Sequence, residues 1–215
     1  MKLRFTSLSL LALCLTLAAV PTAAQTVYNN GPINGNVDAW LIYEDFIVSD
    51  TFNVVNNNTA ITGASFGLWL FPGDTLTSAE LSITSSENGG TSYFDQTVSF
   101  TQGMCHGNER GFNVCQENTS FSGPTLNAGT YWLNLDNASL PSGDPVYWDE
   151  NSGPSSASDN FVGTIPSEAF TVLGTQSSTT STSTTTTGTT PEPSSIILFG
   201  SGVLGLAGML RRRLF

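Results

Sequence analysis

Positive charge is nearly absent from the middle of this 215-residue chain. Six Lys and Arg residues stand against 17 Asp and Glu residues, and Arg110 is the only basic residue between Gln25 and Pro193. Because all 17 acidic residues lie in that same segment, its net charge is one minus 17, or −16. A surface of this sign repels nucleic acid and anionic membranes and attracts divalent cations. We therefore expect no nucleic-acid partner.

The N-terminus has the layout of a secretory signal peptide. Lys2 and Arg4 form a charged region, residues 8–20 are nearly all apolar, and small residues follow up to Ala24. We place the cleavage after Ala24, so residues 1–24 are predicted to form a signal helix that is removed. The rest of the chain is then exported through the inner membrane.

Cysteine is scarce, and only Cys105 and Cys115 remain once Cys14 is removed with the signal peptide. In an oxidising compartment two cysteines normally form one disulfide. A metal site with His106, the only histidine, is the alternative, but two Cys and one His lack a fourth ligand. We therefore predict a Cys105–Cys115 disulfide, which would stabilise the fold by roughly 3 kcal/mol in the chain-entropy model.

Residues 25–174 have almost no helical periodicity and consist of short β-rich runs separated by Gly, Pro, Asn and Asp. In the run 79–84, for example, apolar and polar residues alternate, as on a strand with one buried face. A segment of about 150 residues suits one domain with a real core. We predict an all-β domain, an antiparallel β-sandwich with a jelly-roll-like arrangement. The N-terminal signal helix and a C-terminal transmembrane helix are expected to flank it.

The segment 175–190, TQSSTTSTSTTTTGTT, is low-complexity Ser and Thr. Such a composition cannot build a core, so we expect a solvated linker between the domain and the C-terminal tail. Its mean span would be about 20 Å, enough to hold the domain clear of a membrane.

The tail, residues 191–215, combines three features. Its first three residues are Pro191-Glu192-Pro193. They form a rigid extended tripeptide, because two prolines cannot continue a helix. Residues 196–210 are apolar or small and would form about 22 Å of helix, short of a bilayer core of about 30 Å. Three arginines follow at once and stay cytoplasmic by the positive-inside rule. The arginines that stop membrane transfer are Arg211, Arg212 and Arg213.

This arrangement resembles the PEP-CTERM sorting signal, which has the same tripeptide, a short Gly-containing span and a C-terminal Arg cluster. The resemblance implies that a membrane-embedded exosortase recognises the tripeptide and removes the tail. It also implies an envelope-bearing bacterial host, often one that makes exopolysaccharide. The family usually has Val before the first Pro, where this chain has Thr190. A permanent membrane anchor is the alternative interpretation of the same span.

The domain is also similar to uncharacterised secreted domains that PEP-CTERM proteins often carry. The matching stretches are VSDTFNV, ITGASFGLWLFPGDTL, LNAGTYWLNL and SGDPVYWDENSG. This second resemblance implies no known activity.

Acidic and aromatic residues are concentrated in residues 142–160. Flat aromatic rings stack on sugar faces, and carboxylates accept hydroxyl protons or bind Ca²⁺. The segment therefore indicates a glycan or calcium site, and its candidate residues are Asp144, Tyr147, Trp148, Asp149, Glu150 and Asp159. The alternative, which we favour, is an acidic loop whose Tyr and Trp cover the edge of the sandwich, since aromatic residues more often pack than bind.

One motif points to catalysis. Residues 63–67 fit G-x-S-x-G, and Asp74 or Asp95 and then His106 follow in the order of a Ser-Asp-His hydrolase. A nucleophile elbow needs a strand, a sharp turn and a helix, whereas this pentapeptide lies inside an apolar alternating run. A hydrolase is therefore a distant alternative.

The expected protein is thus exported, non-enzymatic and structural or adhesive, located in the cell envelope, at the cell surface or in the extracellular matrix. A carbohydrate- or calcium-binding module is the second hypothesis. The expected partners are an exosortase, the membrane through the C-terminal helix, and extracellular polysaccharide. No cofactor is expected other than Ca²⁺.

Overall fold

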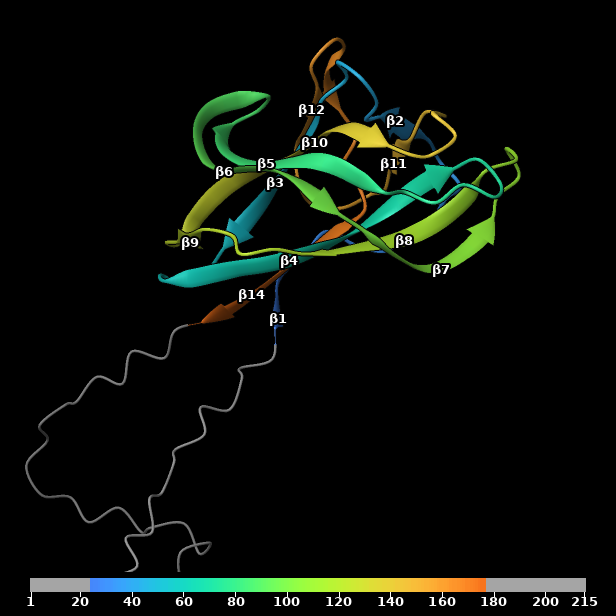
Figure 1. Cartoon of the computed structure of the whole chain (residues 1–215). Coiled ribbons are helices and arrows are strands. Elements are labelled where there is room, and N and C mark those ends of the chain that lie inside the picture. The colour runs from blue at the N-terminus through green and yellow to red at the C-terminus, as the bar shows by residue number, and fades with distance from the viewer. Residues whose placement is uncertain (1–23, 177–215) are drawn as a thin grey trace, which may run out of the picture. The chain divides into compact units, whose positions relative to one another are not determined.

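The computed structural model describes residues 24–176, and in this range it contains fourteen β-strands and no helix (Figure 1). The predicted all-β class is therefore confirmed. No helix in the described range is long and apolar enough to cross a membrane. The predicted signal helix, transmembrane helix, sorting tripeptide and arginine cluster lie outside the described residues.

The strands form two antiparallel sheets packed face to face, so the protein has a β-sandwich (Figure 1). One sheet has eight strands, which are β1 (Gln25–Asn29), β2 (Ala39–Leu41), β4 (Thr59–Leu70), β7 (Thr101–Gly107), β8 (Asn113–Ser120), β9 (Thr125–Leu126), β11 (Tyr147–Asp149) and β14 (Phe170–Gln176). The other has six strands, in the order β13 (Gly163–Ile165), β12 (Ala157–Asp159), β3 (Val48–Val54), β10 (Gly129–Ser139), β5 (Ser78–Ser86) and β6 (Gly89–Ser99).

The core follows the alternation read from the sequence. On β5, Ala79, Leu81 and Ile83 are fully buried, whereas Glu80 and Ser82 between them are half-buried on the opposite face. The long central strand β4 is covered on both faces for part of its length, as its apolar run predicts. Inner faces of both sheets therefore share one apolar core.

The chain enters and leaves the sandwich on neighbouring strands. β1 starts at Gln25, the first residue after the predicted cleavage position, and pairs antiparallel with β14 (Figure 1). β14 continues to Gln176, two residues into the segment that the sequence assigned to the linker. The backbone of Thr175 and Gln176 pairs with β4, so these two residues belong to the domain.

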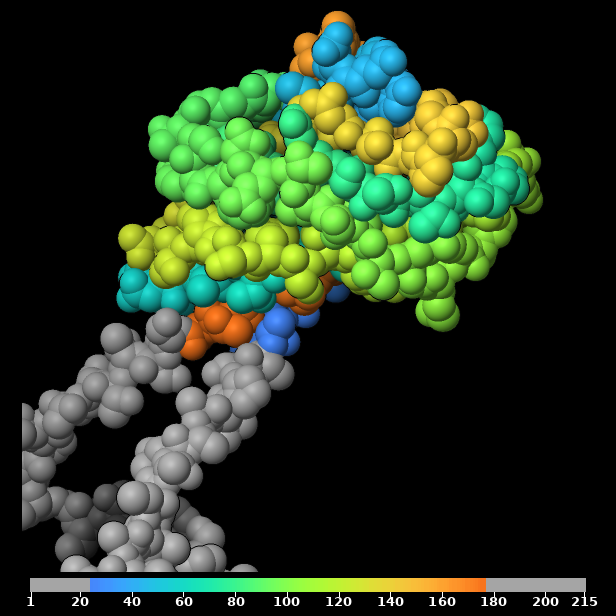
Figure 2. Space-filling view, viewed as in Figure 1, coloured from blue at the N-terminus to red at the C-terminus, as the bar shows by residue number. Residues whose placement is uncertain are grey.

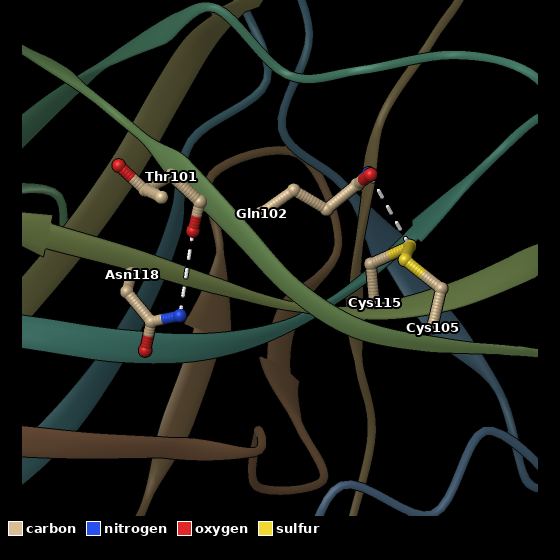
Figure 3. The surroundings of a disulfide bond; sticks show 5 residues. All are labelled: Thr101, Gln102, Cys105, Cys115 and Asn118. Atoms are coloured by element: carbon tan, nitrogen blue, oxygen red, sulfur yellow. Dashed lines mark hydrogen bonds between the residues drawn. A yellow bond between two sulfur atoms is a disulfide. The ribbon is translucent and has the colours of Figure 1, made fainter.

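The structure has the Cys105–Cys115 disulfide (Figure 3). The two cysteines lie directly opposite each other on the antiparallel strands β7 and β8, with 4.1 Å between their Cα atoms. The bond therefore links two paired strands. Beside it, Gln102 Nε2 lies 3.5 Å from Cys115 Sγ (Figure 3).

Candidate functional site

The strand β11 holds the centre of the predicted glycan or calcium segment. It pairs with β4 on one side and β2 on the other, so it lies within the sheet. Its side chains therefore alternate between the two faces: Trp148 enters the core, and Tyr147 lines a surface pocket. The predicted acidic loop is thus a strand at this point.

Trp148 packs inside the protein, so the glycan interpretation of this residue, the less favoured of the two, does not hold. Its side chain is 0% exposed and packs edge-on against Phe66 and Phe170, so neither face of the indole is open to a ligand. Its Nε1 donates a hydrogen bond to the carbonyl of Ala169 at 3.0 Å. Trp148 is a core residue of the sandwich.

Asp149 is buried and is bound by protein groups. Its Oδ2 accepts a hydrogen bond from Asn34 N at 2.8 Å, and its Oδ1 accepts bonds from Gly35 N and Trp69 Nε1 at 3.0 and 2.7 Å. Burial raises the pKa of Asp149, and these three hydrogen bonds act against that rise. The carboxyl group ties the loop before β2 to the outer face of β4.

The remaining acidic candidates lie apart from one another. Glu150 Oε2 accepts a hydrogen bond from Trp40 Nε1 at 3.1 Å. Asp159 lies on β12 in the other sheet, where its Oδ1 accepts bonds from the backbone of Phe161 and Val162. Asp144 lies in the loop before β11. The six predicted residues therefore do not form one site, and no three His, Cys, Asp or Glu side chains of residues 24–176 form a metal site by themselves.

Tyr147 borders an open pocket. This cavity of about 180 Å³, here called the aromatic pocket, is lined by Asp38, Ala39, Trp69, Arg110, Phe112 and Tyr147. The Phe112 ring lies 5.6 Å from the Tyr147 ring and 5.6 Å from the Trp69 ring, measured between centroids. Three aromatic rings with different orientations thus form one wall of the aromatic pocket.

A charged pair forms the polar side of the aromatic pocket. The Arg110 guanidinium lies 5.7 Å from the centre of the Trp69 ring and 3.3 Å from Asp38 Oδ1. Its Nη2 also donates a hydrogen bond to the carbonyl of Val37 at 2.6 Å. Rings beside a cation and a carboxylate suit a ligand with an apolar face and hydroxyl groups.

Sequence reasoning missed most of the aromatic pocket. The signals present were the isolation of Arg110 as the only Lys or Arg between the two ends, and the outward position of Trp69 on β4 and of Phe71 directly after it. The sequence could not show that β2, β4, β11 and the connection between β7 and β8 lie next to one another around this pocket.

A second hollow lies on the outer face of the six-stranded sheet. Its volume is about 220 Å³, and three of its lining residues are the carboxylates Glu80, Asp95 and Asp136 from β5, β6 and β10. Burial raises the pKa of Asp136 to about 6, and the charges of Glu80 and Asp95 add to the rise. This acidic pocket was also missed, because it gathers residues from three strands.

Figure 2 shows a protrusion at one end of the molecule, where the β12–β13 turn lies against the segment before β3. Asn160 N donates to the carbonyl of Ile47 at 3.1 Å, and the rings of Phe46 and Phe161 are 4.7 Å apart. Phe161 and Val162 are exposed at its tip.

A comparison with protein families places the PEP-CTERM protein-sorting motif at residues 189–213. The match includes the tripeptide Pro191–Pro193 and the arginines 211–213, so the resemblance of the tail to the PEP-CTERM sorting signal is confirmed. The chain is thus a β-sandwich protein with a PEP-CTERM tail, which indicates an exported protein sorted by an exosortase at the cell envelope or surface. A comparison with curated proteins found no match.

Proposed function

We propose that this chain is a structural or adhesive protein of the cell envelope or extracellular matrix, without enzymatic activity of its own. The sorting motif at residues 189–213 supports the proposal, since such a motif indicates an exported protein that an exosortase sorts at the cell envelope or surface. The domain fits this role, because a disulfide-linked sandwich with a strongly acidic composition remains soluble outside the cell.

The position of Ser65 supports a non-enzymatic role. The G-x-S-x-G pentapeptide lies in the middle of β4, paired on both sides, and has no turn or helix after the serine. Ser65 Oγ accepts a hydrogen bond from Gln116 Nε2 at 3.0 Å. The strained strand-to-helix elbow that activates such a serine in hydrolases is therefore missing at this position.

The sorting step can be tested on the mature C-terminus. Mass spectrometry of the protein from exosortase-positive cells should show an end near Pro191–Pro193, with the arginines removed. Glu192→Ala should leave an uncleaved, membrane-bound precursor, whereas Ser195→Ala serves as the control and should be processed normally. A native protein that still ends in Arg211 to Phe215 would make the tail a plain anchor and contradict the proposal.

Saccharide binding at the aromatic pocket is the second candidate function. The observation that favours it is the set of partly open rings, Phe112 and Tyr147, beside Arg110 and Asp38. Extracellular polysaccharide would be the partner of such a site.

A glycan array with the full-length protein tests this function. If a saccharide binds, Tyr147→Ala should lower the affinity about tenfold, which corresponds to about 1.4 kcal/mol of lost stacking. Tyr93→Ala is the matched control, because Tyr93 is an exposed tyrosine that packs on Tyr131 and does not line the aromatic pocket. Equal losses in both variants, or no binding to any glycan, would exclude the aromatic pocket as a saccharide site.

A further inference from the structure

Two buried acidic residues, Asp50 and Glu168, lie next to each other in the fold. Asp50 lies on β3 in the six-stranded sheet, and Glu168 lies in the connection between β13 and β14, bridged to Glu150 beside β11. Both residues are 0% exposed. The backbone N of Glu168 donates a hydrogen bond to Asp50 Oδ2 at 2.7 Å, which fixes their proximity.

Three of the four oxygens of these two carboxyl groups lack a hydrogen-bond partner in the described range. Within residues 24–176, neither side-chain oxygen of Glu168 has a hydrogen-bond partner, and Asp50 Oδ1 has none either. Buried carboxylate oxygens without partners are rare, because their desolvation costs several kcal/mol. The only Lys or Arg of the described residues, Arg110, is exposed and pairs with Asp38. No Lys or Arg side chain of this range therefore neutralises the pair.

Neighbouring acidic residues add to this uncompensated negative charge. Burial raises the pKa of Glu168 well above its usual value, and the charges of Asp50, Glu150, Asp149 and Asp38 all act in the same direction. Glu150 and Glu168 face each other directly across an isolated antiparallel β-bridge, which is unfavourable for two like charges. The interior at this point thus has an excess of negative charge and of oxygen atoms.

Four oxygens from separate places in the chain surround the side-chain amide of Asn30. Its Nδ2 lies 3.2 Å from Asp50 Oδ2, 2.6 Å from Ser155 Oγ, 3.2 Å from Ser167 Oγ and 2.7 Å from the carbonyl of Glu168. An amide nitrogen has only two hydrogens, so it cannot donate to all four. The nitrogen therefore lies at a point where oxygen ligands converge.

We propose that this buried oxygen cluster, made of Asn30, Asp50, Ser155, Ser167 and Glu168, binds one Ca²⁺ ion. Asp50 and Glu168 are its charged ligands, and the hydroxyl, amide and backbone oxygens are its neutral ones. This site is distinct from the one that the sequence indicated in residues 142–160. It is also independent of the sorting tail and of the aromatic pocket.

The chemistry of the ligand set selects the ion. Ca²⁺ accepts six to eight oxygen ligands in flexible geometry, including carboxylates and carbonyls, whereas Mg²⁺ requires a strict octahedron and retains waters. Zn²⁺ prefers sulfur and imidazole ligands, and the cluster contains neither. Two carboxylates balance the charge of one divalent ion.

The surroundings of Asn30 allow it to turn its oxygen toward the ion. The Tyr28 hydroxyl donates to Asn30 Oδ1 at 2.9 Å, and after a flip of the amide the same hydroxyl can accept from Nδ2 instead. Gly153 packs directly on Asn30, where a Cβ would collide with the Asn30 carbonyl. The loop that contains Ser155 is therefore held close to the cluster.

The experiment uses the full-length protein, freed of metal with a chelator and then titrated with CaCl₂. Thermal unfolding followed by near-UV circular dichroism should show Tm rising by about 5–10 °C at a hundredfold excess of Ca²⁺ over its Kd. Glu168→Gln keeps the shape of the side chain and removes its charge, so most of this rise should disappear. Equilibrium dialysis should show one bound ion fewer per chain.

Glu117→Gln is the matched control. Glu117 is also 0% exposed with two unpartnered oxygens in the described range, but it lies opposite Phe66 and Gln102, away from the cluster. The Ca²⁺ shift should be intact in this variant. Ser155→Ala gives a second measurement that spares the buried carboxylates, with an expected tenfold weaker Ca²⁺ affinity. An equal shift in wild type and all variants, or no bound ion in wild type, would overturn the proposal and leave Glu168 as a neutral, protonated acid.

Discussion

Glu117 is the clearest place to test how burial controls the stability of this protein. Its side chain lies on the core face of β8, 0% exposed, and neither of its oxygens has a hydrogen-bond partner among the described residues. Burial raises the pKa of Glu117 from 4.5 to about 7, and only the neighbouring side chain of Gln102 acts against the rise. In the folded protein the Glu117 carboxyl group therefore stays mostly neutral up to about pH 7.

The sign of the pH effect follows from this raised pKa. Below about pH 4.5 the group is neutral in both the folded and the unfolded chain and costs nothing. As the pH rises to about 7, only the unfolded chain ionises readily, so the free energy of unfolding falls. At about 1.4 kcal/mol per pKa unit, we expect Glu117 to remove about 2.5 kcal/mol between pH 5 and pH 8.

Urea unfolding of wild type and Glu117→Gln at pH 5 and pH 8 measures this effect. The glutamine does not titrate, so the variant should lose about 2.5 kcal/mol less than wild type over this interval, whatever its absolute stability. Glu109→Gln, a change of an exposed glutamate in the loop after β7, should behave like wild type. Identical pH dependence of wild type and Glu117→Gln would refute the burial argument.

Two further predictions concern the packing of the core and the disulfide. Trp148→Ala should destabilise the fold by about 3–5 kcal/mol, because it empties a fully buried site, whereas Phe161→Ala at the exposed tip should cost less than about 1 kcal/mol; urea unfolding compares them. Alkylation of the exported protein without reductant should label neither Cys105 nor Cys115, and labelling of both would contradict the disulfide.

The strands could be predicted because their signal is local. Alternation along β5 identified Ala79, Leu81 and Ile83 as core residues, and the export signal together with the cysteine count gave the disulfide. The sequence favoured packing of Trp148, but it could not show that this residue enters the core and does not cover an edge. That position depends on β11 lying between β2 and β4, which are far apart in the chain. The same sequence pattern, aromatic residues among carboxylates, describes both a binding loop and a strand through the core.

The candidate sites were missed for the same physical reason. The acidic pocket takes one carboxylate from each of β5, β6 and β10, and the buried oxygen cluster joins residues 30, 50, 155, 167 and 168. None of these sets has a short spacing in the sequence. Only the pairing of distant strands brings them together.

The two kinds of buried carboxyl group should respond to pH in opposite directions. Ca²⁺ must replace any proton on Asp50 and Glu168, so the stability gained from the ion should grow as the pH rises. Glu117 has no ion to replace its proton, so its contribution falls over the same interval. Wild type in saturating Ca²⁺ should therefore show a larger Ca²⁺ increment in the free energy of unfolding at pH 8 than at pH 5, and Glu117→Gln should show the same difference. Glu168→Gln should show almost no increment at either pH. A wild-type increment that is equal at both pH values would mean that the ion binds surface carboxylates that are already ionised at pH 5, and not the buried oxygen cluster.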